Sequence, residues 1–412
     1  MDDISKRFAS LTPEQRALLE LRLKKQGLRS PTEHAPALAA QPAPPTSPVA
    51  ESLEDELDWK SKPVKKSFPF SLYFFSDDGS KDSTDKYRLV LESAKFADCH
   101  GFNAVWTPER HFQDFGGLYP NPSVLGAALA MITERIQIRA GSVALPLHHP
   151  VRVAEEWSVV DNLSGGRVAV SFASGWHPDD FIFAPEVYED RKEAMFRHIE
   201  MIRKLWAGET LMIRGVGGRE VAVRLLPKPL QPDLPIWITS AGSPETWIRA
   251  GEAGANILAA LIGYSFEDLA ERVRLYREAR ASRGHDSGIV SMMVHTFLGT
   301  SNSEVKEKVR APFTHYLSSY FKQYENVRVE AGDITDADRE TIMAAAFEHY
   351  FENNTLMGTP ARCSRVVERM LEAGVDEAAC LVDFGVDADD VLESLYHLNE
   401  LREHYQQAEV GG

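Results

Sequence analysis

The chain has 412 residues, 43% hydrophobic and 26% charged, and its net charge of −16 excludes nucleic acid as a partner, because a polyanion would be repelled. Its cysteines, Cys99, Cys363 and Cys380, are too few and too scattered for a disulfide framework or a Cys-x-x-Cys site, which favours a reducing cytoplasm. The start of the chain lacks the apolar core of a signal peptide, and no apolar run is long enough to cross a bilayer, so we expect a cytoplasmic protein with no membrane partner.

The first 66 residues do not have the pattern of a folded domain. Thr12-Pro13-Glu14-Gln15 predicts the capped start of a helix, whose leucines precede a stop at Gly27. A helix this short cannot form its own core, so we expect residues 1–27 to dock on the rest of the chain, on a second copy or on another protein. Residues 28–66 are rich in proline and alanine and predict an extended linker, in which Trp59 is solvated or meets a partner.

Strands and helices alternate from residue 67 to residue 407. The apolar strand runs cover residues 68–75, 102–106, 136–145, 168–172, 236–240, 255–259, 289–298 and 378–384. A hairpin is predicted at 211–226, and a long insertion precedes the eighth strand. Alternation at this spacing implies parallel strands joined by right-handed crossovers.

Two α/β folds fit this alternation. An open doubly wound sheet would normally have fewer strands and a Gly-x-Gly-x-x-Gly turn after the first of them. The only near match starts at Gly215, inside the predicted hairpin. We therefore predict a closed (β/α)8 TIM barrel at residues 67–407, carrying insertions and preceded by the short helix and its linker.

Polar residues gather where the predicted barrel would have its active site, at the carboxyl ends of the strands. Pro108 breaks the second strand and is followed by Glu109, Arg110 and His111, the catalytic candidates. Small, hydroxyl or aromatic residues at other strand ends predict a seat for a flat ring and a phosphate: Phe74, Phe75, Gly141, Ser142, Ser174, Gly175 and Trp176.

An anion seat is predicted after the fifth strand. Ser240-Ala241-Gly242-Ser243 precedes a helix that starts at Pro244, so backbone amides and hydroxyls face outward, although an ordinary N-cap would have the same pattern. Arg191, just before the fourth helix, is placed to close over the same phosphate from a neighbouring β/α step. No metal site is expected, because no carboxylates stand at a ligand spacing from the candidate histidines: His148, His149 and His177.

Several short motifs carry a resemblance to a known family. They are Trp106-Thr107-Pro108-Glu109-Arg110-His111-Phe112, Pro120-Asn121-Pro122, Leu145-Pro146-Leu147-His148-His149-Pro150, Ser164-Gly165-Gly166-Arg167 and Ser174-Gly175-Trp176-His177-Pro178-Asp179-Asp180-Phe181. In combination, over about residues 68–404, the chain resembles the bacterial luciferase-like flavin monooxygenases, and most of all their natural-product branch associated with nonribosomal peptide and polyketide assembly lines. That resemblance independently implies the barrel.

The resemblance implies a two-component flavin-dependent monooxygenase. Reduced FMN, supplied by a separate flavin reductase, would capture O2 as a flavin C4a-(hydro)peroxide and oxygenate a natural-product intermediate, free or tethered to a carrier protein. The N-terminal helix resembles the short helices that join synthetase domains, which implies a carrier protein or a synthetase module as a partner. Families of this kind also imply a homodimer.

The same resemblance assigns roles to the candidate residues. Arg191 and Ser240-Ala241-Gly242-Ser243 correspond to positions that hold the FMN phosphate, whereas Ser174 stands where luciferase has a second phosphate-binding arginine. Gly141-Ser142 corresponds to a cis peptide beneath the flavin ring. Arg110 stands where luciferase has its catalytic histidine, so proton transfer would pass to His111 or His177.

Two other functions fit the same sequence. The barrel also serves oxidoreductases that use the deazaflavin F420 without O2. A barrel without activity would instead make the chain a docking subunit of an assembly line, held through residues 1–27.

Overall fold

The computed structural model describes residues 59–61, 64, 66–75, 85–113, 116–175, 177–328 and 336–406, and the side chains of all of these except 320–342. The predicted helix at residues 1–27, most of the predicted linker and Trp176 lie outside the described residues. The domain boundaries inferred from the sequence therefore stay predictions.

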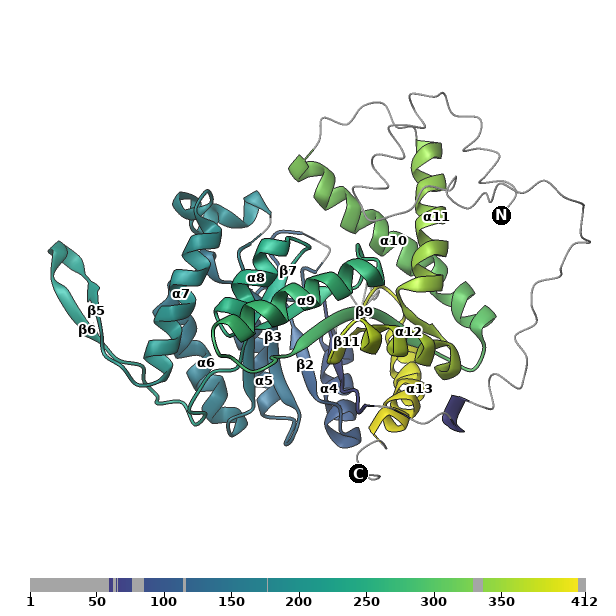
Figure 1. Cartoon of the computed structure of the whole chain (residues 1–412), viewed down its shortest axis with the longest axis horizontal. Helices are drawn as coiled ribbons and strands as arrows, with labels where there is room; N and C mark the ends of the chain where they lie inside the picture. Colours follow the sequence, from purple (N-terminus) through teal and green to yellow (C-terminus); the bar gives the residue numbers. More distant parts are fainter. Residues whose placement is uncertain are drawn as a thin grey trace, which may run out of the picture.

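Eight parallel strands close into a barrel in the described part of the chain (Figure 1). Each strand pairs with the next, and the eighth returns to the first, in the order β1 (Phe70–Tyr73), β2 (Ala104–Thr107), β3 (Gln137–Ala144), β4 (Val168–Ala173), β7 (Ile236–Ser240), β8 (Asn256–Ala260), β9 (Val290–Leu298) and β11 (Glu377–Leu381). The short β10 (Leu356–Gly358) pairs with the last residues of β9. The predicted (β/α)8 barrel is confirmed.

Helices cover the outside of the barrel (Figure 1). Capping side chains fix several starts: Asn121 accepts the amide N–H groups of Ser123 at 2.9 Å and Val124 at 3.1 Å. Within the described residues, no helix is both long enough and apolar enough to cross a bilayer. The helices are α4 (Arg88–His100), α5 (Pro122–Ala130), α6 (Pro150–Ser164), α7 (Arg191–Trp206), α8 (Pro244–Glu252), α9 (Phe266–Ser282), α10 (Asn302–Arg328), α11 (Asp336–Asn353), α12 (Pro360–Glu372) and α13 (Ala388–Gln406).

Two insertions interrupt the regular alternation, as the sequence predicted. β5 (Leu211–Arg214) and β6 (Glu220–Val223) form an antiparallel hairpin that projects at the left of Figure 1. The second insertion lies between β9 and β11, where α11 and β10 follow α10. In Figure 1, α10 and α11 rise beyond the barrel at the upper right.

A buried ion-pair network fills the barrel near the amino-terminal ends of its strands. Arg139 Nη1 and Ser291 Oγ donate hydrogen bonds to Glu377 Oε2 at 2.7 and 2.6 Å. The guanidinium carbon of Arg139 lies 4.7 Å from the ring centroid of Trp106 and 4.5 Å from that of Trp237. Because the side chains of Arg139 and Glu377 are 2% and 1% exposed, the network closes this end of the barrel, and the opposite end is left for chemistry.

Trp59 does not behave as part of a solvated linker. It begins a 3-10 turn (Trp59–Ser61), is 6% exposed, and its ring centroid lies 4.8 Å from that of His404 on α13. The expectation of a solvated or partner-bound tryptophan is wrong, because packing a large indole against the barrel removes more apolar surface from water. This turn therefore packs on the barrel although it precedes residue 67.

Candidate active site

The carboxyl end of β2 presents a carboxylate that holds two imidazoles. Glu109 Oε1 lies 2.9 Å from Nε2 of His111 and 2.5 Å from Nε2 of His148. Its second oxygen, Oε2, accepts the backbone N–H of Ala144 at 2.8 Å, and its own N–H donates to the carbonyl of Ser142 at 3.0 Å. The Glu109 side chain is 2% exposed. The ends of β2 and β3 are thus joined through one buried carboxylate.

The partners of Glu109 keep it ionised. Burial alone would raise the pKa of Glu109, but hydrogen bonds from His111, His148 and Ala144 outweigh burial and lower it. Burial alone would likewise lower the pKa of His148, and the Glu109 carboxylate raises it. An anionic carboxylate beside an imidazolium is therefore the favoured state of this pair.

A second polar cluster joins the ends of β1, β2 and β11. Asp383, two residues after β11, accepts the N–H of Phe75 at 2.9 Å and the hydroxyl of Tyr119 at 2.9 Å. Arg110 is 5% exposed and its guanidinium carbon lies 4.9 Å from the ring centroid of Phe75. Burial, together with the charge of Asp383, raises the pKa of Tyr73, and Arg110 opposes this shift. Arg110 and Asp383 therefore both lie near the Tyr73 hydroxyl, on the inner side of the barrel rim.

The segment between β4 and α7 folds over these groups. Burial raises the pKa of Asp180, in the 3-10 turn Pro178–Phe183, and the charges of His111, Arg110 and His177 oppose the shift, so all four lie close together. The ring centroid of Phe183 lies 5.0 Å from that of His111. Phe183 is 54% exposed, so an apolar ring lies at the outer edge of the site beside His111.

The Gly141–Ser142 peptide bond is cis, as the resemblance implied. It lies within β3, directly before the residues that contact Glu109. The hydroxyl of Tyr73 donates to the carbonyl of Gly141. The cis geometry is confirmed, and its place beneath a flavin stays a prediction.

Gly141→Ala is expected to lower the free energy of unfolding by about 1–3 kcal/mol through overpacking. A Cβ at Gly141 would lie 2.8 Å from the Tyr73 ring and 3.1 Å from the Trp106 ring, and both rings are buried. Urea unfolding measures the loss. Gly126→Ala in α5 is the control, because its Cβ would meet Ile138 at an ordinary 3.4 Å. Equal stability of the Gly141 variant and the parent would contradict this packing.

The predicted anion seat has an uncapped helix start. Ser240 is 3% exposed, and Gly242, in the left-handed region at φ 118°, donates its N–H to Ser240 Oγ at 3.4 Å. Ser243 stands at the N-cap of α8, but its side chain makes no capping hydrogen bond. The ordinary side-chain N-cap is therefore not what forms. Pro244 has no N–H and the Thr246 N–H donates to the Ser243 carbonyl at 3.1 Å, so within the first turn the Glu245 N–H is the donor that faces an anion at this helix start.

Arg191 is not joined to this seat by any contact among the described residues. Its Nη1 donates to the carbonyl of Tyr188 at 2.7 Å, and its guanidinium carbon lies 4.4 Å from that ring. The two β/α steps are nevertheless adjacent, because Arg249 of α8 pairs with Glu193 of α7 at 3.0 Å. A role of Arg191 at the phosphate stays a prediction.

The remaining predicted residues divide between the rim and the core. Phe75 lies at the rim, whereas Phe74 is fully buried and alternates with Tyr73 and Phe75, so it faces the helices. Ser174 and Gly175 follow β4, and a Cβ at Gly175 would meet the Phe181 ring at 2.8 Å. Trp176 lies outside the described residues.

Sequence reasoning gave no role to two residues of this site. His148 was considered only as a metal ligand, yet it contacts Glu109. Asp180 belonged to a motif without an assigned role. Their one sequence signal is position, since His148 comes after the predicted strand 136–145 and Asp180 after the predicted strand 168–172, both at the end where a barrel works.

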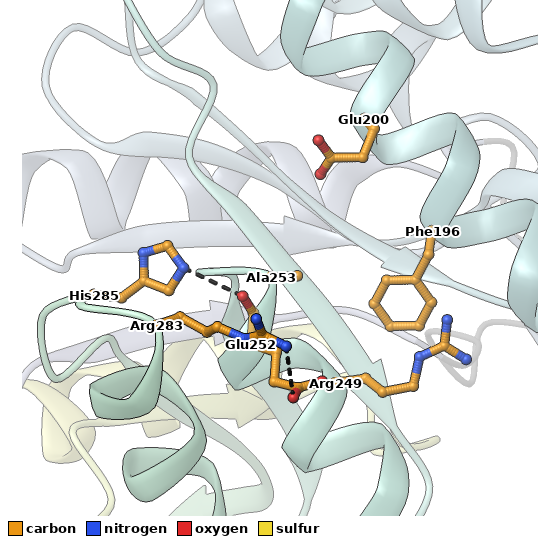
Figure 2. A pocket seen from close by; sticks show the side chains of 7 residues that line it. All are labelled: Phe196, Glu200, Arg249, Glu252, Ala253, Arg283 and His285. Carbon is orange, nitrogen blue, oxygen red and sulfur yellow. Dashed lines mark hydrogen bonds and ion pairs between the residues drawn. The ribbon is translucent and has the colours of Figure 1, made fainter.

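Two hollows of the described surface lie away from this rim. One, of about 430 Å³, is lined by residues of α7, by the end of α8 and by the turn after α9 (Figure 2). A second, of about 820 Å³, includes Ile236 and Asn256, the first residues of β7 and β8. Both therefore lie toward the amino-terminal side of the strands. No group of three or more metal-ligating side chains gathers in the described residues.

Residues 68–377, well over half of the chain, match the family described as luciferase-like monooxygenase. The chain belongs to this family. Two relatives of this luciferase-like monooxygenase are named for their reactions. This chain is 26% identical to the oxygenase component of a flavin-dependent trigonelline monooxygenase from Acinetobacter baylyi, over 83% of this chain and 96% of that one. It is 30% identical to 4-hydroxyprotoasukamycin monooxygenase from Streptomyces nodosus subsp. asukaensis, over 69% of this chain and 76% of that one. The chain is thus an enzyme of the flavin-dependent monooxygenase kind.

Solved structures share the fold with this luciferase-like monooxygenase. The oxygenating constituent of 3,6-diketocamphane monooxygenase from Pseudomonas putida, in complex with FMN, has a TM-score of 0.66 at 18% identity, over 81% of this chain and 97% of that one. An F420-dependent tetrahydromethanopterin reductase from Methanopyrus kandleri has a TM-score of 0.62 at 17% identity, over 81% and 99%. The fold alone therefore does not select between FMN and F420.

Proposed function

We propose that this enzyme is the oxygenase of a two-component system that uses reduced FMN and O2 to oxygenate an organic intermediate of natural-product biosynthesis. The observation that carries the proposal is the set of ionisable groups at one barrel rim, Glu109 with His111 and His148, beside the cis peptide Gly141–Ser142. Reduced FMN would supply the electrons that activate O2.

The residues at the rim offer groups that would suit the phosphate and the ring of FMN. The uncapped start of α8, with Ser240-Ala241-Gly242-Ser243, would hold the phosphate together with Arg191. Gly141 and Ser142 would lie under the ring, and Phe75, Ser174, Gly175 and Trp176 around it. His111 would hold or move the proton through Nδ1, because its Nε2 already contacts Glu109. Arg110 would stabilise negative charge nearby.

The partners in this proposal are a flavin reductase, a second copy and a carrier protein. The relative named as an oxygenase component supports a separate reductase. The relative named 4-hydroxyprotoasukamycin monooxygenase supports a natural-product substrate. We propose that a carrier protein or synthetase module binds at residues 1–27. A homodimer is supported by exposed apolar side chains on or just after α5 and on α6: Val124, Met131, Val159 and Leu163.

Reoxidation of FMN tests the proposed function. Protein mixed anaerobically with photoreduced FMN, and then with O2, should delay the return of oxidised-flavin absorbance relative to free FMN. Reoxidation at the rate of free FMN would contradict the proposal. Since the fold is shared with an F420-dependent enzyme, F420 is titrated in parallel, and tight binding of F420 without FMN binding would favour that second function.

Arg191→Met is expected to weaken FMN binding about tenfold to a hundredfold and to leave riboflavin binding unchanged, because only FMN carries the phosphate. Fluorescence titration measures both affinities. Arg197→Met is the matched control, since Arg197 lies on the same helix and pairs with Asp190 at 2.6 Å. Equal losses for FMN and riboflavin would remove Arg191 from the phosphate.

A further inference from the structure

The function proposed above assigns no proton-transfer step to His148, the second imidazole on Glu109. His148 comes from the turn that follows β3, 39 residues from Glu109, and it reaches the same oxygen, Oε1, as His111 does. An ionised carboxylate only accepts hydrogen bonds, so both rings donate through Nε2. On each ring, Nδ1 is therefore the nitrogen that gains or loses a proton.

Sharing one carboxylate couples the two rings. A proton added to either ring is stabilised by the negative charge of Glu109. Two imidazolium ions on one oxygen would repel each other at close range, so the ring that is protonated first disfavours protonation of the other. The pair therefore holds one extra proton more readily than two.

The surroundings favour His148 as the ring that holds this proton. The His148 side chain is 35% exposed, against 10% for His111, and the charge of Glu156 on α6, which is itself paired with Arg152 at 3.0 Å, adds to that of Glu109. His111 packs against Phe183, and its other charged neighbour is Asp180, whose burial favours the neutral carboxylic acid. Arg110 also acts on Asp180, and its guanidinium adds positive charge on the side of His111.

We propose that His148 is a positioning residue that, through the shared carboxylate, keeps His111 neutral with its proton on Nε2. Nδ1 of His111 then remains a proton acceptor at the mouth of the site. Without a charged partner on Glu109, His111 takes the extra proton and loses that acceptor. The consequence for oxygenation rests on the proposed function, whereas the coupling between the rings does not.

Proton NMR of ¹³C-labelled histidine in the flavin-free protein tests the coupling. His148→Gln keeps an N–H donor for Glu109 but carries no charge, so the titration midpoint of His111 should rise by about 1 pH unit or more. His149→Gln is the matched control, because the neighbouring His149 accepts the N–H of Val151 at 3.3 Å instead. That variant should leave the His111 midpoint in place.

The reciprocal variant checks the same coupling from the other ring. His111→Gln should leave the midpoint of His148 nearly in place, because His111 is neutral, like glutamine, over the pH range in which His148 takes its proton. A rise of the His148 midpoint by about 1 pH unit or more in His111→Gln would show that His111 holds the first proton and would overturn the proposal. This measurement also serves if His148→Gln does not fold. An unchanged His111 midpoint in folded His148→Gln overturns the proposal, and so does an equal shift in His149→Gln. If the histidine midpoints shift as expected but the protein does not slow the reoxidation of FMN, this inference holds and the proposed function is wrong.

Discussion

Glu377→Ala is expected to lower the free energy of unfolding by about 3–5 kcal/mol, because it leaves the Arg139 guanidinium buried without its carboxylate. Glu377 Oε2 accepts hydrogen bonds from Arg139 at 2.7 Å and Ser291 at 2.6 Å, and both charged side chains are at most 2% exposed. Trp106 and Trp237 flank the guanidinium, so water has little access to it. Guanidinium-chloride unfolding at pH 7 measures the loss.

Two comparison variants separate the buried charge from general damage. Replacing both partners with apolar residues, as in Arg139→Met with Glu377→Leu, should cost much less than the single change. Glu271→Ala removes a carboxylate from an exposed pair with Arg274, and it should leave the unfolding midpoint in place. If the double variant is as unstable as Glu377→Ala, the loss of stability does not come from an unpaired buried charge.

The contribution of Glu377 should depend on pH with a definite sign. Burial raises the pKa of Glu377, but Arg139 and the hydrogen bonds from Ser291, Ser71 and Asn103 outweigh burial and lower it below the ordinary 4.5. The unfolded state therefore binds this proton first as pH falls, so the stabilisation is full above about pH 4.5 and decreases below it. The difference in unfolding free energy between the parent and Glu377→Ala should therefore narrow as pH falls below about 4.5.

Most of the fold could be predicted from periodicity and helix-start signals. Pro122, Pro150, Pro244 and Pro360 each begin a helix at or next to its predicted start. Strand limits were less accurate, since the predicted strand at 378–384 ends at Leu381. An apolar run in the sequence indicates which residues are buried, not which are paired in the sheet. Residues at the barrel rim stay buried beyond the end of a strand, so the run extends past it.

The site could be predicted only where its residues are local in sequence. Glu109 and His111 are two residues apart, whereas His148 and Glu109 are separated by 39 positions and Tyr119 and Asp383 by 264. Which distant groups meet depends on the register between neighbouring strands, and turn lengths at the rim adjust it further. Composition and spacing do not encode that register. His148 was therefore outside the reach of a single sequence.

His111→Ala is expected to lower the rate of product formation about 10²- to 10⁴-fold, the range that a positioned proton-transfer group contributes. The ring is 10% exposed, its Nε2 contacts Glu109, and Phe183 covers its outer side, so Nδ1 is the atom left to serve the reacting groups. Reduced FMN and O2 would still be consumed, and hydrogen peroxide should replace product. Product and peroxide are quantified per O2 consumed.

His177→Gln distinguishes this role from that of the other candidate histidine. His177 is 8% exposed and its Nδ1 accepts the N–H of Asp179 at 3.3 Å, so that nitrogen is already engaged. The His177 variant should keep most of its product yield, and His111→Ala should keep the FMN affinity of the parent, which shows an intact site. If His111→Ala retains its yield while His177→Gln loses it, proton transfer belongs to His177, and the Glu109 carboxylate serves to hold the rim together rather than to prepare a base.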